Sequence, residues 1–137
     1  MIEAVADRPR PEPSELTARF WEAAREHVLV RPVCSACGKS FFTPQIACPV
    51  CLSLDWTYER SNGRGTVYSA TVVYRAPFPG LTTPYQVAIV DLSEGWSMLT
   101  NIVDSHELPT PIDTEVEVAW LDVDAELTLP VFAPVQR

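Results

Sequence analysis

The sequence lacks the local motifs that mark the common classes of enzyme. It contains no G-x-S-x-G nucleophile elbow, no Walker-type phosphate loop and no G-x-G-x-x-G dinucleotide fingerprint. Its only histidines, His27 and His106, are far apart in the chain, and no cysteine or serine lies at a nucleophile-like turn. The carboxylates fall mostly in turns or on outward-facing strand positions, as on a solvated surface. We therefore predict that the chain is not catalytic by itself.

Long apolar runs are also missing. No run approaches the roughly 18 residues that a membrane span requires. Residues 1–13 are proline-rich and lack the apolar core of a signal peptide. We expect no membrane contact and a cytoplasmic location. At 137 residues, the chain should form one domain or two small lobes.

Positive charge is scarce and unevenly placed. The chain has 10 Lys and Arg against 18 Asp and Glu, which gives a net charge of −8. Nine of the ten bases lie at or before Arg75, and the stretch from Ala76 onward has ten acids and one base, Arg137. Nucleic-acid binding draws much of its affinity from neutralising phosphates, so this distribution argues against it. The sequence leaves open the binding of a small anionic ligand near Arg60, Arg64 and Arg75.

The four cysteines form two C-x-x-C pairs, Cys34 with Cys37 and Cys48 with Cys51. Two such turns present four thiolates to one ion, the tetrahedral set that structural Zn²⁺ prefers. A disulfide framework would need an oxidising compartment, and a thioredoxin-like motif would need a single pair at a strand-to-helix junction. Iron in the same thiolate cage is the main alternative to zinc. Four protein ligands leave no open coordination position, so the predicted site is structural.

The residues around the two pairs are not equivalent. Gly38 follows the first pair, where a backbone that turns back on itself benefits from a residue that tolerates positive φ. Leu52 follows the second pair, where glycine would be easier. Between the pairs lie Phe41 and Phe42, and we expect at least one of these rings to pack on the metal site.

The N-terminal part of the chain is predicted to contain a flexible arm at residues 1–13 and a helix and zinc ribbon at 14–60. Ser14 is a candidate N-cap for a helix that ends near His27. Trp21 lies off the apolar stripe of this helix, so it either folds over its own helix or is covered by a partner. Residues 28–33 form a short strand that leads into the first knuckle. The stripe itself comprises Leu16, Phe20, Ala23, Ala24 and His27.

Residues 61–137 have the pattern of a small barrel. After the turn at 61–65, five strand-like segments follow without a strong helix between them. They cover residues 66–74, 85–92, 96–103, 115–123 and 127–132. An oligonucleotide/oligosaccharide-binding (OB) barrel is the natural five-stranded candidate, and a five-stranded sandwich is the alternative. The fold class is thus mainly β: an N-terminal helix, a rubredoxin-like zinc ribbon and a five-stranded OB-fold barrel.

The loop at residues 76–84 is stiffened by prolines and carries the apolar side chains of Phe78 and Leu81. A stiff apolar loop suits a binding edge, because little conformational entropy is lost on docking. The alternative is that Phe78 plugs one end of the barrel.

Several of these features occur together, in this order, in one known family. They are Phe20-Trp21-Glu22, Cys34-x-x-Cys37-Gly38, Cys48-Pro49-x-Cys51, Gly63-Arg64-Gly65-Thr66-Val67-Tyr68-Ser69, Pro84-Tyr85, Leu99-Thr100-Asn101-Ile102-Val103 and Leu129-Pro130-Val131-Phe132. From about Ser14 to Phe132 the chain resembles the acyl-CoA-associated zinc-ribbon/OB-fold family, catalogued as domain of unknown function thirty-five. The resemblance implies a metal role for the four cysteines and a fold of helix, ribbon and barrel.

The resemblance also implies a function. Members of this family accompany thiolase-fold and other acyl-CoA enzymes as small non-catalytic subunits, and some work beside enoyl-CoA hydratases of the hot-dog type. In bacterial steroid side-chain breakdown, such a domain pairs with a thiolase-fold aldolase. The first hypothesis is therefore an accessory subunit of a thiolase-fold enzyme, with Trp21, Phe78 and Leu81 at the interface.

Two other hypotheses remain. One is a stand-alone acyl-CoA binding module, in which Arg64 and Arg75 contact the CoA phosphates. This assignment comes from the charge distribution and not from the family. The other is a nucleic-acid-binding ribbon/OB protein, which the charge distribution disfavours.

Overall fold

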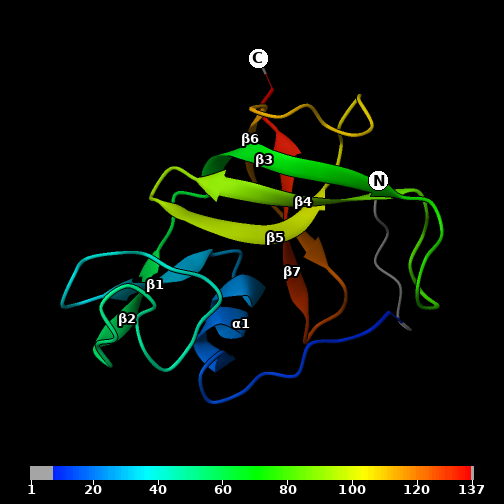
Figure 1. Ribbon diagram of the computed structural model, residues 1–137. Helices are drawn as coiled ribbons and strands as arrows, with labels where there is room; N and C mark the ends of the chain where they lie inside the picture. The colour runs from blue at the N-terminus through cyan, green and yellow to red at the C-terminus, as the bar shows by residue number, and fades with distance from the viewer. Residues whose placement is uncertain (1–7, 137) are drawn as a thin grey trace.

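The computed structural model describes residues 8–136, which form one helix, a two-stranded sheet and a closed barrel (Figure 1). Helix α1 lies between the two-stranded sheet and the barrel strand β7. The elements are α1 (Ala18–Arg25), β1 (Val30–Cys34), β2 (Trp56–Arg60), β3 (Arg64–Val73), β4 (Tyr85–Leu92), β5 (Trp96–Ile102), β6 (Glu115–Asp122) and β7 (Thr128–Pro134). No helix within residues 8–136 has the length and apolar character needed to cross a membrane.

The helix is shorter than predicted. Ser14 nevertheless starts a turn ahead of it, because its Oγ accepts a hydrogen bond from the N–H of Thr17 and its N–H donates to Thr17 Oγ1. The helix ends before His27, which takes a positive φ of 59°. Of the predicted flexible arm, residues 1–7 lie outside the described residues. In the remainder, Arg10 pairs with Asp124 at 2.7 Å.

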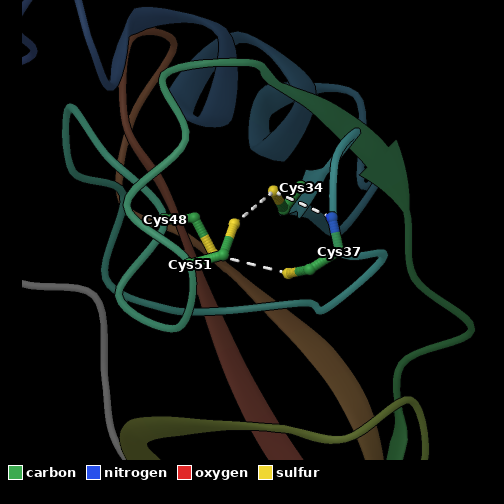
Figure 2. Close-up of side chains that lie close together, drawn as sticks. All are labelled: Cys34, Cys37, Cys48 and Cys51. Carbon is green, nitrogen blue, oxygen red and sulfur yellow. Dashed lines mark hydrogen bonds between the residues drawn. The ribbon is translucent and has the colours of Figure 1, made fainter.

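The ribbon is built on β1. This strand pairs with β2 on one side and, through the hydrogen bond from Cys34 N–H to Lys39 O and the bridge between Val33 and Ser40, with the segment after the first knuckle on the other. The two knuckles then bring the four cysteine side chains together (Figure 2).

The barrel closes in the order β3-β4-β5-β7-β6, which confirms the five-stranded barrel and excludes the sandwich. The long antiparallel pairs are β3–β4, β4–β5 and β6–β7. The β5–β7 seam has a single parallel bridge, between Ile102 and Phe132. Pro130 accounts in part for the small number of hydrogen bonds between β5 and β7. Its carbonyl faces β5 and accepts a hydrogen bond from Thr100 Oγ1, but proline has no N–H to donate on that side.

Two glycines permit the close approach of strands where the barrel begins. A Cβ on Gly63, whose φ is +69°, would lie 2.4 Å from Val118 Cγ1, and a Cβ on Gly65 would lie 2.3 Å from the carbonyl oxygen of Asp91. Both distances are shorter than any real contact of a Cβ atom. The Gly63-Arg64-Gly65 motif is therefore required by packing.

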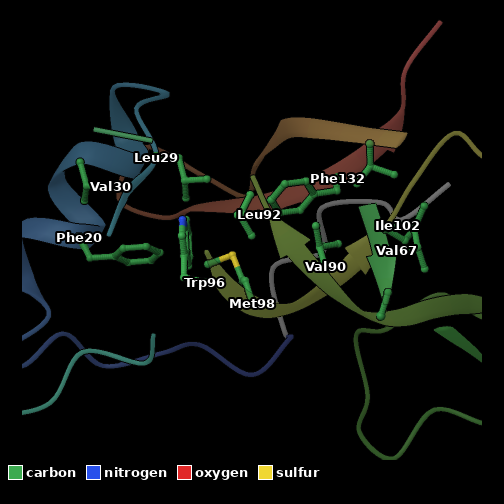
Figure 3. Close-up of a cluster of buried hydrophobic side chains, with 12 residues drawn as sticks. Phe20, Leu29, Val30, Val67, Val90, Leu92, Trp96, Met98, Ile102 and Phe132 are labelled. Carbon is green, nitrogen blue, oxygen red and sulfur yellow. The ribbon is translucent and has the colours of Figure 1, made fainter. Parts of the chain in front are cut away.

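One hydrophobic core joins the helix, the ribbon and the barrel (Figure 3). Phe20 of α1 and Trp96 of β5 are each 4% exposed and belong to the same cluster. The ring of Phe42 lies between them, with centroids 5.3 Å from Phe20 and 5.5 Å from Trp96. The ribbon is thus attached to the barrel by packed aromatic side chains as well as by the chain itself.

Candidate metal centre and surrounding surfaces

The four cysteine sulfurs all lie within 4.8 Å of one another. The closest pairs join the two knuckles, at 3.5 Å between Cys34 and Cys51 and 3.7 Å between Cys37 and Cys48. Zinc with Zn–S bonds of about 2.3 Å in a tetrahedron requires sulfur–sulfur distances of about 3.8 Å. The four sulfurs are therefore close enough together to bind one tetrahedral ion.

The two knuckles have the same hydrogen-bond pattern. Gly38 N–H donates to Cys34 O at 2.9 Å, and Leu52 N–H donates to Cys48 O at 2.9 Å. Gly38 and Leu52 accordingly take matching φ values of 76° and 65°. Leu52 therefore does occupy a position that favours glycine, and its side chain is 75% exposed with no buried contact to offset the strain.

Backbone N–H groups also point at the sulfurs. Those of Cys37 and Val50 lie 3.5 and 3.4 Å from the sulfurs of Cys34 and Cys48, respectively. The N–H of Cys37 is the main cause that lowers the pKa of the Cys34 thiol to about 6. This N–H group favours the thiolate form of Cys34 that a metal ion requires, whereas the neighbouring thiol of Cys34 contributes to a raised pKa of Cys51.

The centre is sealed on one side only. Cys34 and Cys48 are 1% and 0% exposed and cluster with Phe41, whereas Cys37 and Cys51 are exposed. The ring of Phe41 packs edge-on against Trp56 at 5.7 Å. The expectation that one ring packs at this site is confirmed, and the two phenylalanines divide their roles: Phe41 faces the cysteines and Phe42 faces the barrel.

The structure does not bring Arg64 and Arg75 together. They lie at opposite ends of β3. At a rise of about 3.3 Å per residue, the two ends of this strand are roughly 30 Å apart. Arg64 borders a hollow of about 400 Å³ whose other charged residues are Asp91 and Glu115. The two arginines therefore do not form one anion site.

The three predicted interface residues lie in two places. Trp21 is half-buried against Phe20, with ring centroids 5.1 Å apart, so it does fold partly over its own helix. Phe78 and Leu81 lie in the loop between β3 and β4, away from α1 (Figure 1). Phe78 is 56% exposed, so the alternative that it plugs the barrel is wrong.

The sequence interpretation missed Glu94, which joins the ribbon to the barrel. Its carboxylate accepts hydrogen bonds from Ser61 Oγ at 2.6 Å, Asn62 N–H at 2.8 Å and Trp96 Nε1 at 3.0 Å, and it lies 3.7 Å from Arg31. Burial raises the pKa of Glu94, but these donors and the charge of Arg31 outweigh burial and leave the pKa below its usual value. The sequence marks Glu94 only as a turn residue, because its partners lie elsewhere in the chain.

His27 also has a distant partner that spacing does not reveal. Its Nε2 lies 2.9 Å from the carboxylate of Asp122, and its ring stacks on Trp120 with centroids 5.4 Å apart. The hydrogen bond from His27 is the main cause that lowers the pKa of Asp122. This contact ties the end of α1 to β6.

Family models match both halves of the chain. Residues 21–57 match the description "ChsH2, rubredoxin-like zinc ribbon domain" and residues 58–121 match "ChsH2, C-terminal OB-fold domain". Among solved structures, a chain of an "Ltp2-ChsH2(DUF35) aldolase" superposes with a TM-score of 0.83 at 40% identity, over 91% of this chain and 98% of that one. The chain belongs to the ChsH2/DUF35 family.

Two curated relatives are longer proteins. The probable enoyl-CoA hydratase alpha subunit of Thermomonospora curvata is 41% identical over 93% of this chain and 40% of its own length. The 3-oxo-4,17-pregnadiene-20-carboxyl-CoA hydratase alpha subunit of Mycobacterium tuberculosis is 34% identical over 82% of this chain and 36% of its own. The chain thus spans about two fifths of the length of these two relatives.

Proposed function

We propose that this chain is a non-catalytic accessory subunit that binds and stabilises a thiolase-fold acyl-CoA enzyme, a thiolase or a retro-aldolase. The observation that carries the proposal is the 40% identity over nearly the whole length of the ChsH2(DUF35) chain of an aldolase. A steroid or lipid side chain is the proposed acyl group, because a relative is named for a pregnadiene carboxyl-CoA. A hydratase subunit is a further candidate partner, since the two longer relatives are named as hydratase subunits.

The residues support a structural metal and no chemistry of their own. Cys34, Cys37, Cys48 and Cys51 would hold Zn²⁺ with all four positions filled by protein, so the ion would stabilise the ribbon and would not bind substrate. Elemental analysis of the purified protein should find one zinc per chain, and a dominant iron content would contradict this assignment.

The function is tested by recovery of the tagged chain from native lysate, followed by mass spectrometry and gel filtration. We expect a thiolase-fold protein in fixed ratio, and acyl-CoA turnover by that protein that depends on this chain. The chain alone should show no turnover. Recovery of this chain only as a free monomer would contradict the accessory role.

A stand-alone acyl-CoA binding module is the second candidate, supported by Arg64, which lines the hollow of about 400 Å³. It predicts micromolar affinity for CoA thioesters without a partner, measured by calorimetry. Replacement of Arg64 by alanine should then weaken binding, and unchanged affinity would exclude Arg64 as a contact; Arg75, which does not line this hollow, serves as the control.

A further inference from the structure

Strand β2 is an open edge of the ribbon. It pairs only with β1 among the strands of residues 8–136, and the other edge of β1 is already occupied by the segment at 39–41. The free edge of β2 therefore offers backbone groups for a further strand.

The hydrogen-bond register identifies these groups. Ser35 N–H donates to Asp55 O and Ser61 N–H donates to Leu29 O, so the odd-numbered residues of this stretch bond to β1. In an antiparallel pair the intervening residues point their N–H and C=O groups away. Trp56 and Tyr58 thus direct theirs to the open edge.

The open edge borders a groove against helix α1. The hydroxyl of Tyr58 donates to Leu16 O at 2.7 Å and crosses the groove. A hollow of about 490 Å³ lies on the Trp56 side of this bond, and one of about 370 Å³ lies on the Val30 side. Both hollows are lined by Arg19 and Tyr58, so they adjoin each other.

The side of this groove formed by α1 and the residues next to its ends carries more acids than bases. Glu15 lines the first hollow and Glu22 and Glu26 line the second, against Arg19 on the helix and Arg60 on β2. All three glutamates are exposed. A strand added beside β2 would place side chains about 7 Å apart on the face of Tyr58, so the two that flank Tyr58 would enter the two hollows.

We propose that an extended segment of the thiolase-fold partner adds to the free edge of β2 and places basic side chains against the glutamates on the α1 side of the groove. This inference rests on the proposed function and specifies how the partner is bound. Backbone pairing supplies the binding mode, and the charge of the groove selects the segment. Self-pairing of two copies is disfavoured, because each chain has a net charge of −8.

The test is hydrogen exchange, resolved to single amides, on the complex with the thiolase-fold partner recovered above. The amides of Trp56 and Tyr58 should exchange at least about tenfold more slowly in the complex than in the free chain. Those of Thr57 and Glu59, which already bond to β1, should change less. Residues 96–102 of β5 serve as the reference within the same molecule.

A charge-reversal pair gives an independent readout. The double variant Glu22→Lys, Glu26→Lys should raise the Kd for the partner about tenfold, whereas Glu107→Lys, Glu117→Lys, with the same change in net charge on exposed sites elsewhere, should stay within about twofold. A complex that forms with Trp56 and Tyr58 unprotected would overturn the inference and leave the accessory function intact. Absence of any complex would overturn both. If the free chain forms a dimer in which the β2 amides are protected, the occupant of the edge is a second copy of the chain and the proposed partner segment is wrong.

Discussion

The ribbon and the barrel are stabilised in different ways. The buried cluster of the ribbon consists of Cys34, Phe41 and Cys48 with Trp56 packed beside it, and two of these four residues are predicted metal ligands. The barrel has five hydrogen-bonded strands around a core that includes Val67, Val90 and Phe132, each fully buried. A small lobe with little apolar surface needs a cross-link, whereas a closed barrel distributes its stability over many contacts.

Removal of the metal should produce the largest difference in stability between the ribbon and the barrel. Chelation, or the variant Cys48→Ser, should abolish amide protection in residues 30–60, because the ribbon core is too small to remain folded without the ion. Protection in β3 to β7 should persist. Hydrogen exchange with and without added zinc checks this, and simultaneous unfolding of both regions would show that they form one cooperative unit.

The neighbouring rings Phe41 and Phe42 should give different phenotypes. Phe41→Ala should destabilise the ribbon by about 3 kcal/mol and speed zinc release, because the ring seals the cysteine cluster. Phe42→Ala should cost about 2 kcal/mol in urea unfolding and leave zinc release nearly unchanged, because this ring packs on Phe20 and Trp96. Equal zinc-release rates for the two variants would contradict the division of roles.

Glu94 should make the ribbon–barrel junction sensitive to acid. Its pKa in the folded chain is below the ordinary value of 4.5, so its stabilisation is present above about pH 4.5 and is lost as pH falls through the folded pKa. The variant Glu94→Gln should flatten the loss of stability in this acidic range. Zinc also dissociates in acid, so the readout is the difference in urea midpoint between wild type and variant, with the exposed Glu107→Gln as control. An identical acid dependence in all three proteins would refute the role of Glu94.

The smallest effect concerns the second knuckle. Leu52→Gly should stabilise the zinc-loaded protein by about 0.5 kcal/mol, because glycine relieves the strain of positive φ. The gain is small because glycine also raises the conformational entropy of the unfolded chain, which opposes folding. The matched control is Leu54→Gly, a residue that is also exposed but lacks a positive φ, and it should destabilise. Thermal unfolding of both variants provides the comparison, and a destabilised Leu52→Gly would refute the strain.

Local sequence features predicted much of the architecture. Strand-like segments bounded by turn residues located the barrel strands, and β4 coincides with the predicted range 85–92. Elsewhere the boundaries differ from the prediction, since β7 continues to Pro134 and the helix begins at Ala18. Ser14, the predicted N-cap, instead accepts a hydrogen bond from Thr17 N–H in the turn that precedes the helix. Ends of elements depend on tertiary packing and on turn geometry, and these are the parts that periodicity does not encode.

The sequence by itself determined the cysteine cluster, the order of the elements and the glycine positions where the barrel begins, since each depends on short-range spacing. Only the tertiary structure decided which phenylalanine faces the cysteines, that Glu94 and His27 connect regions distant in the chain, and that Arg64 and Arg75 lie apart. It also decided that β2 keeps an open edge beside a groove in which Glu15, Glu22 and Glu26 face Arg19 and Arg60. The physical reason is that these contacts join residues from separate elements, and their partners are specified by how a twisted sheet closes on itself and packs against the helix.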